Sequence, residues 1–178
     1  MKKFLSLIIL IACFTSCSNN KTPEIKLNEF TQKAPELVDQ TITVTGIAKH
    51  ICHNSGRKIF LTPSLDSDVV INVTAGETID RFDIETEGKT YKINGIVKVA
   101  SVIDQAYLDQ WEKEVIEQGV QEGTHICATE QQAEGIEISN NEENPQMTRI
   151  KSYRAKIEEN NGEPLTFYHI VCNSFEIE

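Results

Sequence analysis

The chain has 178 residues and a formal net charge of −10 at pH 7, with 27 Asp and Glu residues against 17 Lys and Arg. That length suits one globular domain with a core large enough to fold without disulfide bonds. The acidic balance repels phosphate backbones and anionic headgroups on average, so it disfavours nucleic acid as a partner.

The first seventeen residues have the pattern of a bacterial lipoprotein signal. Two lysines are followed by an apolar stretch, residues 4–14, that is too short to span a bilayer, and then by a small-residue cleavage site that ends in Cys17. We expect residues 1–16 to be removed, Cys17 to carry lipid, and residues 17–26 to form a tether. The predicted location is the bacterial cell envelope, lipid-anchored on the periplasmic side or the cell surface. The alternative is an ordinary secretory signal with Cys17 as a spare thiol.

After the tether, the pattern indicates a short helix and then strands. Apolar residues recur at helical spacing from Leu27 to Lys33, and Pro35 is expected to end or bend that helix. A turn is predicted at 54–56 and a helical or turn segment at 77–82. Short segments rich in β-branched and aromatic residues predict four strands, at 41–50, 57–62, 68–74 and 89–102.

The hydrophobic period then changes to that of helices. Asp104 is placed to cap a helix whose apolar residues fall three and four apart as far as Val115. Residues 128–143 are acidic, polar and without a pattern, so we expect a mobile insertion there. A second helix is predicted after its cap, Asn144, and a last strand at 165–177.

These elements predict a mainly β fold with helices, in the α+β class. Four strands, a helical excursion and a closing strand match a five-stranded OB-like barrel. An N-terminal helix precedes the barrel and two helices are inserted before its last strand. We expect a single OB-like domain over residues 27–178.

Two segments of the chain resemble parts of a known group of proteins. Residues 44–61 read VTGIAKHICHNSGRKIFL and residues 165–176 read LTFYHIVCNSFE. The first segment resembles the strand-turn-strand core of OB-fold lipoproteins of the Bacteroidetes kind, and the second is similar to the end of those proteins. The likeness covers residues 27–177. It implies architecture, since that group brings no assigned activity.

Histidines and cysteines lie close together along the chain. Thiolate and imidazole are ligands that zinc and other transition metals select, so these clusters predict a transition-metal site, with zinc as the first candidate. The candidate ligands are His50, Cys52, His53, His125, Cys127, His169 and Cys172.

Several features weaken the metal hypothesis. His169 and Cys172 are three apart, so they point to opposite faces of a regular strand. The spacing also matches none of the strong zinc signatures. The alternatives are that Cys127 and Cys172 are small buried hydrophobic residues, or that two of the cysteines form one disulfide bond.

The turn after the first strand has a second interpretation. Ser55, Gly56, Arg57 and Lys58 could hold an anionic group through backbone amides and positive charge, near the loop that OB barrels use for ligands. The alternative is that Arg57 and Lys58 are solvated charges at a strand edge.

Together these observations predict a lipid-anchored envelope binding module with an OB-like barrel that holds a transition-metal ion through its His and Cys clusters. The alternative is a metal-free barrel that binds an oligosaccharide, a nucleotide or a peptide, or docks on another envelope protein. Catalysis is not favoured: Cys52 with His50 or His53 could form a nucleophile and base, but nothing marks an oxyanion site. The sequence assigns no catalytic residue.

Overall fold

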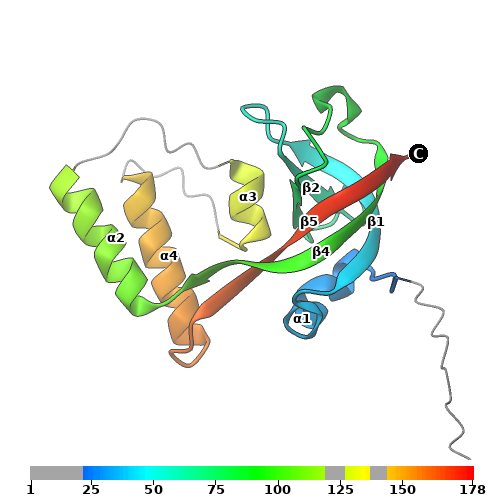
Figure 1. Ribbon diagram of the computed structural model, residues 1–178. Helices are drawn as coiled ribbons and strands as arrows, with labels where there is room; N and C mark the ends of the chain where they lie inside the picture. The colour runs from blue at the N-terminus through cyan, green and yellow to red at the C-terminus, as the bar shows by residue number, and fades with distance from the viewer. Residues whose placement is uncertain (1–21, 119–126, 137–143) are drawn as a thin grey trace, which may run out of the picture.

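The computed structural model describes residues 22–118, 127–136 and 144–178. Its strands are β1 (Thr41–Ile51), β2 (Lys58–Thr62), β3 (Ile71–Ala75), β4 (Thr90–Ile103) and β5 (Leu165–Ile177). They form a closed barrel in the order β1-β2-β3-β5-β4, in which β4 also pairs with β1. All pairs are antiparallel except β3 with β5, which is parallel. The predicted α+β fold with a five-stranded OB-like barrel is confirmed (Figure 1).

Close contacts explain two glycines in the barrel strands. A Cβ atom on Gly46 would overlap the end of the Leu27 side chain, and one on Gly95 would lie 2.5 Å from the carbonyl oxygen of Val171. Gly95 also lies at a register shift between β4 and β5, where the strand bends. A larger residue at Gly95 would push β4 and β5 apart, and one at Gly46 would displace the Leu27 side chain.

Helix α1 (Leu27–Leu37) covers one part of the barrel core. Its buried side chains are Leu27, Phe30 and Ala34, and all three belong to the barrel core cluster. The helix continues past Lys33 to Leu37 with Pro35 inside it, so Pro35 does not end it. Pro35 stands in the last turn, where its missing N–H removes one hydrogen bond but few residues follow.

The connection from β3 to β4 contains a turn and a short helix. The expected helical or turn segment at 77–82 is present as a turn at residues 77 and 78, and the 3-10 helix η1 follows at Ile84–Thr86. Phe82 is 1% exposed and packs in the barrel core, and its N–H donates to the Gly56 carbonyl over 2.8 Å. This long-range contact holds the segment before η1 against the β1–β2 turn.

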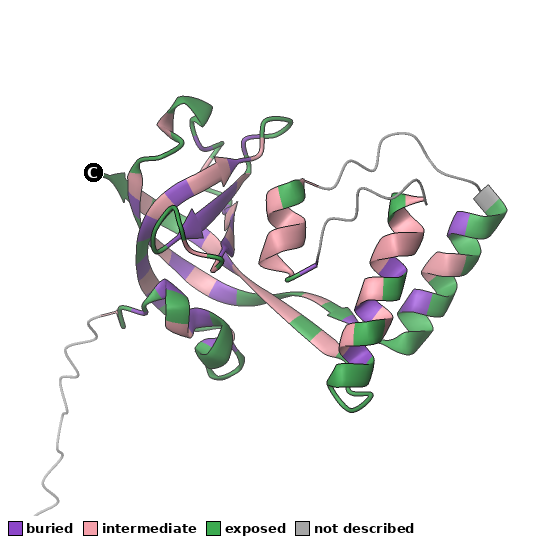
Figure 2. Cartoon of the chain, turned by 180° about the vertical axis from the view of Figure 1, so that it is seen from behind, coloured by how far each residue is buried: buried purple, intermediate pink, exposed green. Residues whose placement is uncertain are grey.

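Strands β4 and β5 extend beyond the barrel and carry a helical unit formed by α2 (Gln105–Gln118) and α4 (Pro145–Glu159) (Figure 1). Both predicted caps are confirmed: Asp104 Oδ1 accepts from the Tyr107 N–H, and Asn144 Oδ1 accepts from the Gln146 N–H. The buried residues form two groups, one in the barrel and one between α2 and α4 (Figure 2). The second core consists of Ile103, Leu108, Val115, Ile136, Ile150, Tyr153 and Ile157.

A short helix, α3 (Ala128–Ala133), lies in the segment that was expected to be a patternless insertion. No residue of α3 is buried, which is why no hydrophobic period marks it in the sequence. Ile136, just after it, is buried in the second core. Residues 137–143 of the predicted insertion lie outside the described residues.

None of the helices in the described ranges is long and apolar enough to cross a bilayer.

Candidate functional site

The β1–β2 turn is fixed by backbone contacts on both sides. Gly56 has a φ of 64°, in the left-handed region that favours glycine. Its N–H donates to the Cys52 carbonyl over 2.7 Å, and its carbonyl accepts from the Phe82 N–H. The turn is thereby joined to the segment that leads into η1, and the two together form one rim of the barrel.

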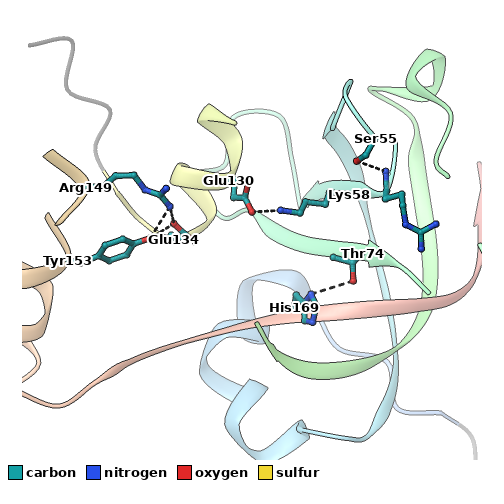
Figure 3. Close-up of polar contacts among 9 residues, drawn as sticks. Ser55, Lys58, Thr74, Glu130, Glu134, Arg149, Tyr153 and His169 are labelled. Carbon is teal, nitrogen blue, oxygen red and sulfur yellow. Dashed lines mark hydrogen bonds and ion pairs between the residues drawn. The ribbon is translucent and has the colours of Figure 1, made fainter. Parts of the chain in front are cut away.

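The structure places Ser55, Gly56, Arg57 and Lys58 side by side, as their sequence requires, but most of their polar groups have internal partners. The Arg57 guanidinium donates to the carbonyls of Ile79, Asp80, Ala75 and Gly76, at 2.7 to 3.4 Å. The Arg57 N–H donates to Ser55 Oγ, and Lys58 Nζ lies 2.6 Å from Glu130 Oε1 on α3 (Figure 3). Arg57 is exposed, but its guanidinium also joins this turn to the end of β3 and to the loop after it.

A cavity of about 770 Å³ opens beside this turn. It lies between the turn and the segment around η1, and it contains amide, hydroxyl, guanidinium and carboxylate groups together with apolar surface. Of the four turn residues proposed from the sequence, Ser55 and Gly56 line it, and Arg57 and Lys58 do not. Its lining residues are His53, Asn54, Ser55, Gly56, Arg81, Phe82, Asp83, Ile84 and Glu85.

Two of the predicted metal ligands meet at the same rim. His50 Nδ1 lies 2.9 Å and His53 Nε2 lies 3.5 Å from the same oxygen, Oε1 of Glu87. The three ligand atoms all lie within 4.8 Å of one another. Strand β1 ends at Ile51, so the chain turns there and brings His53 back beside His50, with ring centroids 5.3 Å apart.

Glu87 was missed by the sequence reasoning. It lies 34 positions after His53 and follows η1 in a segment with many acidic residues, so no local spacing marks it. The contact arises from the pairing of β1 with β4, which brings the residues just before β4 beside the end of β1. The Ala48 N–H donates to the Lys89 carbonyl and the Gly88 N–H to the Ala48 carbonyl, on either side of that junction. Only the barrel topology, and no local pattern in the sequence, indicates that Glu87 lies beside the histidines.

The other predicted metal ligands lie elsewhere or are not described. Cys52 is partly exposed beside the histidines but contributes no atom to the converging group. Cys127 precedes α3, and Cys172 is buried in the barrel core. All three described cysteines are free thiols. His125 and the predicted lipidation site Cys17 lie outside the described residues.

His169 and Cys172 have environments that oppose charge. Burial, and secondly the charge of Lys58, lower the pKa of His169, whose Nδ1 lies 3.4 Å from Thr74 Oγ1 (Figure 3). Burial raises the pKa of the Cys172 thiol to about 11, although its sulfur donates to the Ser174 carbonyl. A thiol of this kind is protonated at neutral pH, whereas a metal ligand must be a thiolate.

Comparisons with known proteins add little about function. No protein-family model matches the chain, and no curated protein matches it by sequence. Among solved structures, a putative aspartyl-tRNA synthetase from Leishmania major Friedlin matches with 15% sequence identity and a TM-score of 0.35. The match covers 49% of this chain and 18% of that one. The chain thus corresponds to less than a fifth of the length of that protein.

Proposed function

We propose that the chain is a lipid-anchored protein of the bacterial cell envelope whose OB-like barrel serves as a ligand-binding module. The lipoprotein pattern that ends at Cys17 supports the anchor, and the likeness to OB-fold lipoproteins supports the setting. Loss of Lys2 and Lys3 with the leader changes the net charge from −10 to −12. Acyl chains on Cys17 would then hold an acidic, folded body at a membrane.

The cavity beside the β1–β2 turn is the observation that carries the binding proposal. OB barrels bind ligands near the loop between their first two strands, and this cavity of about 770 Å³ lies against that loop. It is of the size in which small-molecule sites usually fall, roughly 300 to 1,000 Å³. We assign it as the ligand site of the barrel.

The groups around the cavity favour a neutral, hydroxyl-rich ligand, and we propose an oligosaccharide. Arg81 contributes positive charge, while Asp83 and Glu85 contribute negative charge, so neither sign prevails strongly. Amide and carboxylate oxygens accept hydrogen bonds from hydroxyl groups, and Ile84 is 40% exposed and offers an apolar contact. The negative net charge disfavours nucleic acid at the same place.

The anchor is tested by expressing the full chain in a bacterial host and measuring lipid on the protein by mass spectrometry. We expect acylated Cys17 and a membrane-bound protein, whereas Cys17→Ala should be recovered without lipid. Mature wild-type protein that begins at another residue, or that has an unmodified thiol at Cys17, would contradict the anchor.

The ligand is tested by NMR titration of ¹⁵N-labelled residues 18–178 with neutral oligosaccharides, peptides and a short oligonucleotide. Oligosaccharides should shift the amide signals of Asn54, Ser55 and Glu85, and Asn54→Ala should weaken the response. Gln32→Ala, an exposed change on α1, is the matched control. If only the peptides shift these signals, the ligand is a peptide and the oligosaccharide proposal is wrong. If no probe shifts them, the cavity is not a binding site.

The transition-metal ion predicted from the histidines and cysteines belongs to this proposal as well. Its site is separate from the cavity, although His53 lines the cavity as well.

A further inference from the structure

We propose that His50, His53 and Glu87 bind one zinc ion at the barrel rim, with a fourth coordination position open to solvent. The proposal deepens the metal part of the proposed function, on which it rests, and it requires neither the lipid anchor nor the oligosaccharide. It also differs from the ligand set that the sequence indicates, since it uses Glu87 and no cysteine. Among the described residues, these three are the one group of three or more His, Cys, Asp and Glu side chains whose ligand atoms converge.

The spacing of the ligand atoms fits a zinc ion. Zinc binds His nitrogen and carboxylate oxygen at roughly 2.0 to 2.2 Å in tetrahedral geometry, which places two ligand atoms about 3.4 Å apart. The observed separations from Glu87 Oε1 are 2.9 Å to His50 Nδ1 and 3.5 Å to His53 Nε2. These two values lie on either side of the ideal spacing, and no two of the three ligand atoms are more than 4.8 Å apart, so an ion would draw the side chains together by rotation.

A backbone contact orients Glu87 and a ring contact orients His50 before any ion binds. Glu87 Oε1 also accepts the Ile51 N–H over 2.6 Å, which orients the carboxylate toward β1. The His50 ring stacks on buried Phe60, with centroids 6.0 Å apart and planes 20° from parallel. Fixed ligands lose less conformational entropy on binding, so such preorganisation favours affinity.

The third ligand is also the most accessible one. The side chain of His53 is 63% exposed, compared with 22% for His50 and 34% for Glu87. An ion can therefore enter from solvent on the His53 side. Because His53 also lines the cavity, the open position of the zinc ion would face a space that a ligand can occupy.

The ligand chemistry distinguishes zinc from other divalent cations. Imidazole nitrogen suits zinc and other transition metals, whereas Mg²⁺ and Ca²⁺ prefer oxygen ligands throughout. Two histidines, one glutamate and a water molecule form a common zinc set. Since the imidazoles must be unprotonated to bind, affinity falls as the solution is acidified.

The test uses residues 18–178, which include every residue of both cores, prepared without a histidine tag and without chelators. Metal content is measured by mass spectrometry, and Zn²⁺ binding by calorimetry. We expect about one zinc per molecule and roughly a tenfold or greater loss of affinity in His50→Gln, His53→Gln and Glu87→Gln. Gln at position 87 keeps an oxygen that can accept the Ile51 N–H, and thermal melting without metal checks that each variant is folded.

Three matched variants serve as controls. His169→Gln removes the one other described histidine, Glu77→Gln removes an exposed carboxylate outside the cavity, and Cys52→Ala removes the adjacent thiol. All three should bind zinc like the unaltered protein. Cobalt in place of zinc should give the visible spectrum of a tetrahedral site without a thiolate-to-metal band.

Three results would overturn the proposal. The first is the absence of zinc binding by folded protein. The second is binding that survives in His50→Gln and Glu87→Gln or is lost in Cys52→Ala, since either moves the ligands elsewhere. The third is preference for Fe²⁺ over Zn²⁺ in competition, because two histidines and a carboxylate also suit iron. Failure of the oligosaccharide titration with retained zinc binding would refute only the ligand, so the two proposals are tested separately.

Discussion

Lys58 on β2 forms an ion pair of 2.6 Å with Glu130 on α3, and this contact ties the barrel to the helical insertion (Figure 3). The two residues are 72 positions apart in the sequence. The charge of Lys58 also acts on His169 of β5, whose pKa it lowers in addition to the larger effect of burial. One lysine therefore influences both the seating of α3 and the protonation of a histidine on another strand.

Replacing Lys58 by Met should raise the pKa of His169. The positive charge disfavours a second positive charge nearby, so its removal eases protonation, although burial still opposes it. Glu130→Gln should act in the opposite direction, since it leaves Lys58 without its counter-charge. An NMR titration of the His169 ring protons measures both shifts. Lys113→Met on α2 is the control, and an unchanged pKa in Lys58→Met would refute the coupling.

The lowered pKa of His169 makes stability depend on pH. The unfolded chain takes up this proton near pH 6.5, while the folded protein resists it to lower pH. The stabilisation is thus fully present above pH 6.5 and is lost as the pH falls through the folded-state pKa. In urea titrations at pH 7.5 and pH 5, His169→Gln should lose less stability than the wild type. Equal losses would show that other groups account for the acid sensitivity.

The three described cysteines should react at different rates. Cys172 is fully buried and burial raises its pKa to about 11, so little thiolate is present at neutral pH. Cys52 and Cys127 are partly exposed. With a thiol reagent, residues 18–178 should show two thiols that react in the native state and a third that reacts only after denaturation. Cys172→Ala should leave the native count unchanged; if it lowers that count, Cys172 is accessible.

Substituting Arg57 by Lys should destabilise the protein by about 1 to 2 kcal/mol despite the retained charge, because an ammonium cannot reproduce a planar fork of donors. The guanidinium donates to four carbonyls of the loop after β3. Urea unfolding measures the change, and Arg81→Lys at the exposed cavity edge should stay within about 0.5 kcal/mol of the wild type. Equal stability of the two variants would mean that these hydrogen bonds contribute nothing.

Gly95→Ala should destabilise the barrel by about 1 to 3 kcal/mol, since the new methyl group would overlap the backbone of β5. Its Cβ would lie 2.5 Å from the Val171 oxygen and 2.6 Å from Ile170 Cγ2. Ala100→Ser, an exposed change on the same strand, is the control. Thermal unfolding compares the two, and an unchanged midpoint in Gly95→Ala would show that β4 and β5 separate easily there.

The barrel could be predicted from the sequence because its strands bury alternate residues, as in β1, where Ile42 and Val44 are buried and Thr41 and Thr45 are exposed. Helix α4 could be predicted because its cap and its apolar face are both local signals. The place of Glu87 in the candidate site could not be predicted, because only strand pairing brings this residue to His50. The short helix α3 was also missed, because ion pairs rather than an apolar face attach it.

The place of β5 between β3 and β4 has a consequence for biosynthesis. The barrel cannot close while the ribosome is still making the 13 residues of β5, because the edges of β3 and β4 have no partner until then. A parallel pair joined across a long insertion also forms slowly. Until β5 is made, the sheet of β1 to β4 therefore has two open edges, which can pair with another chain.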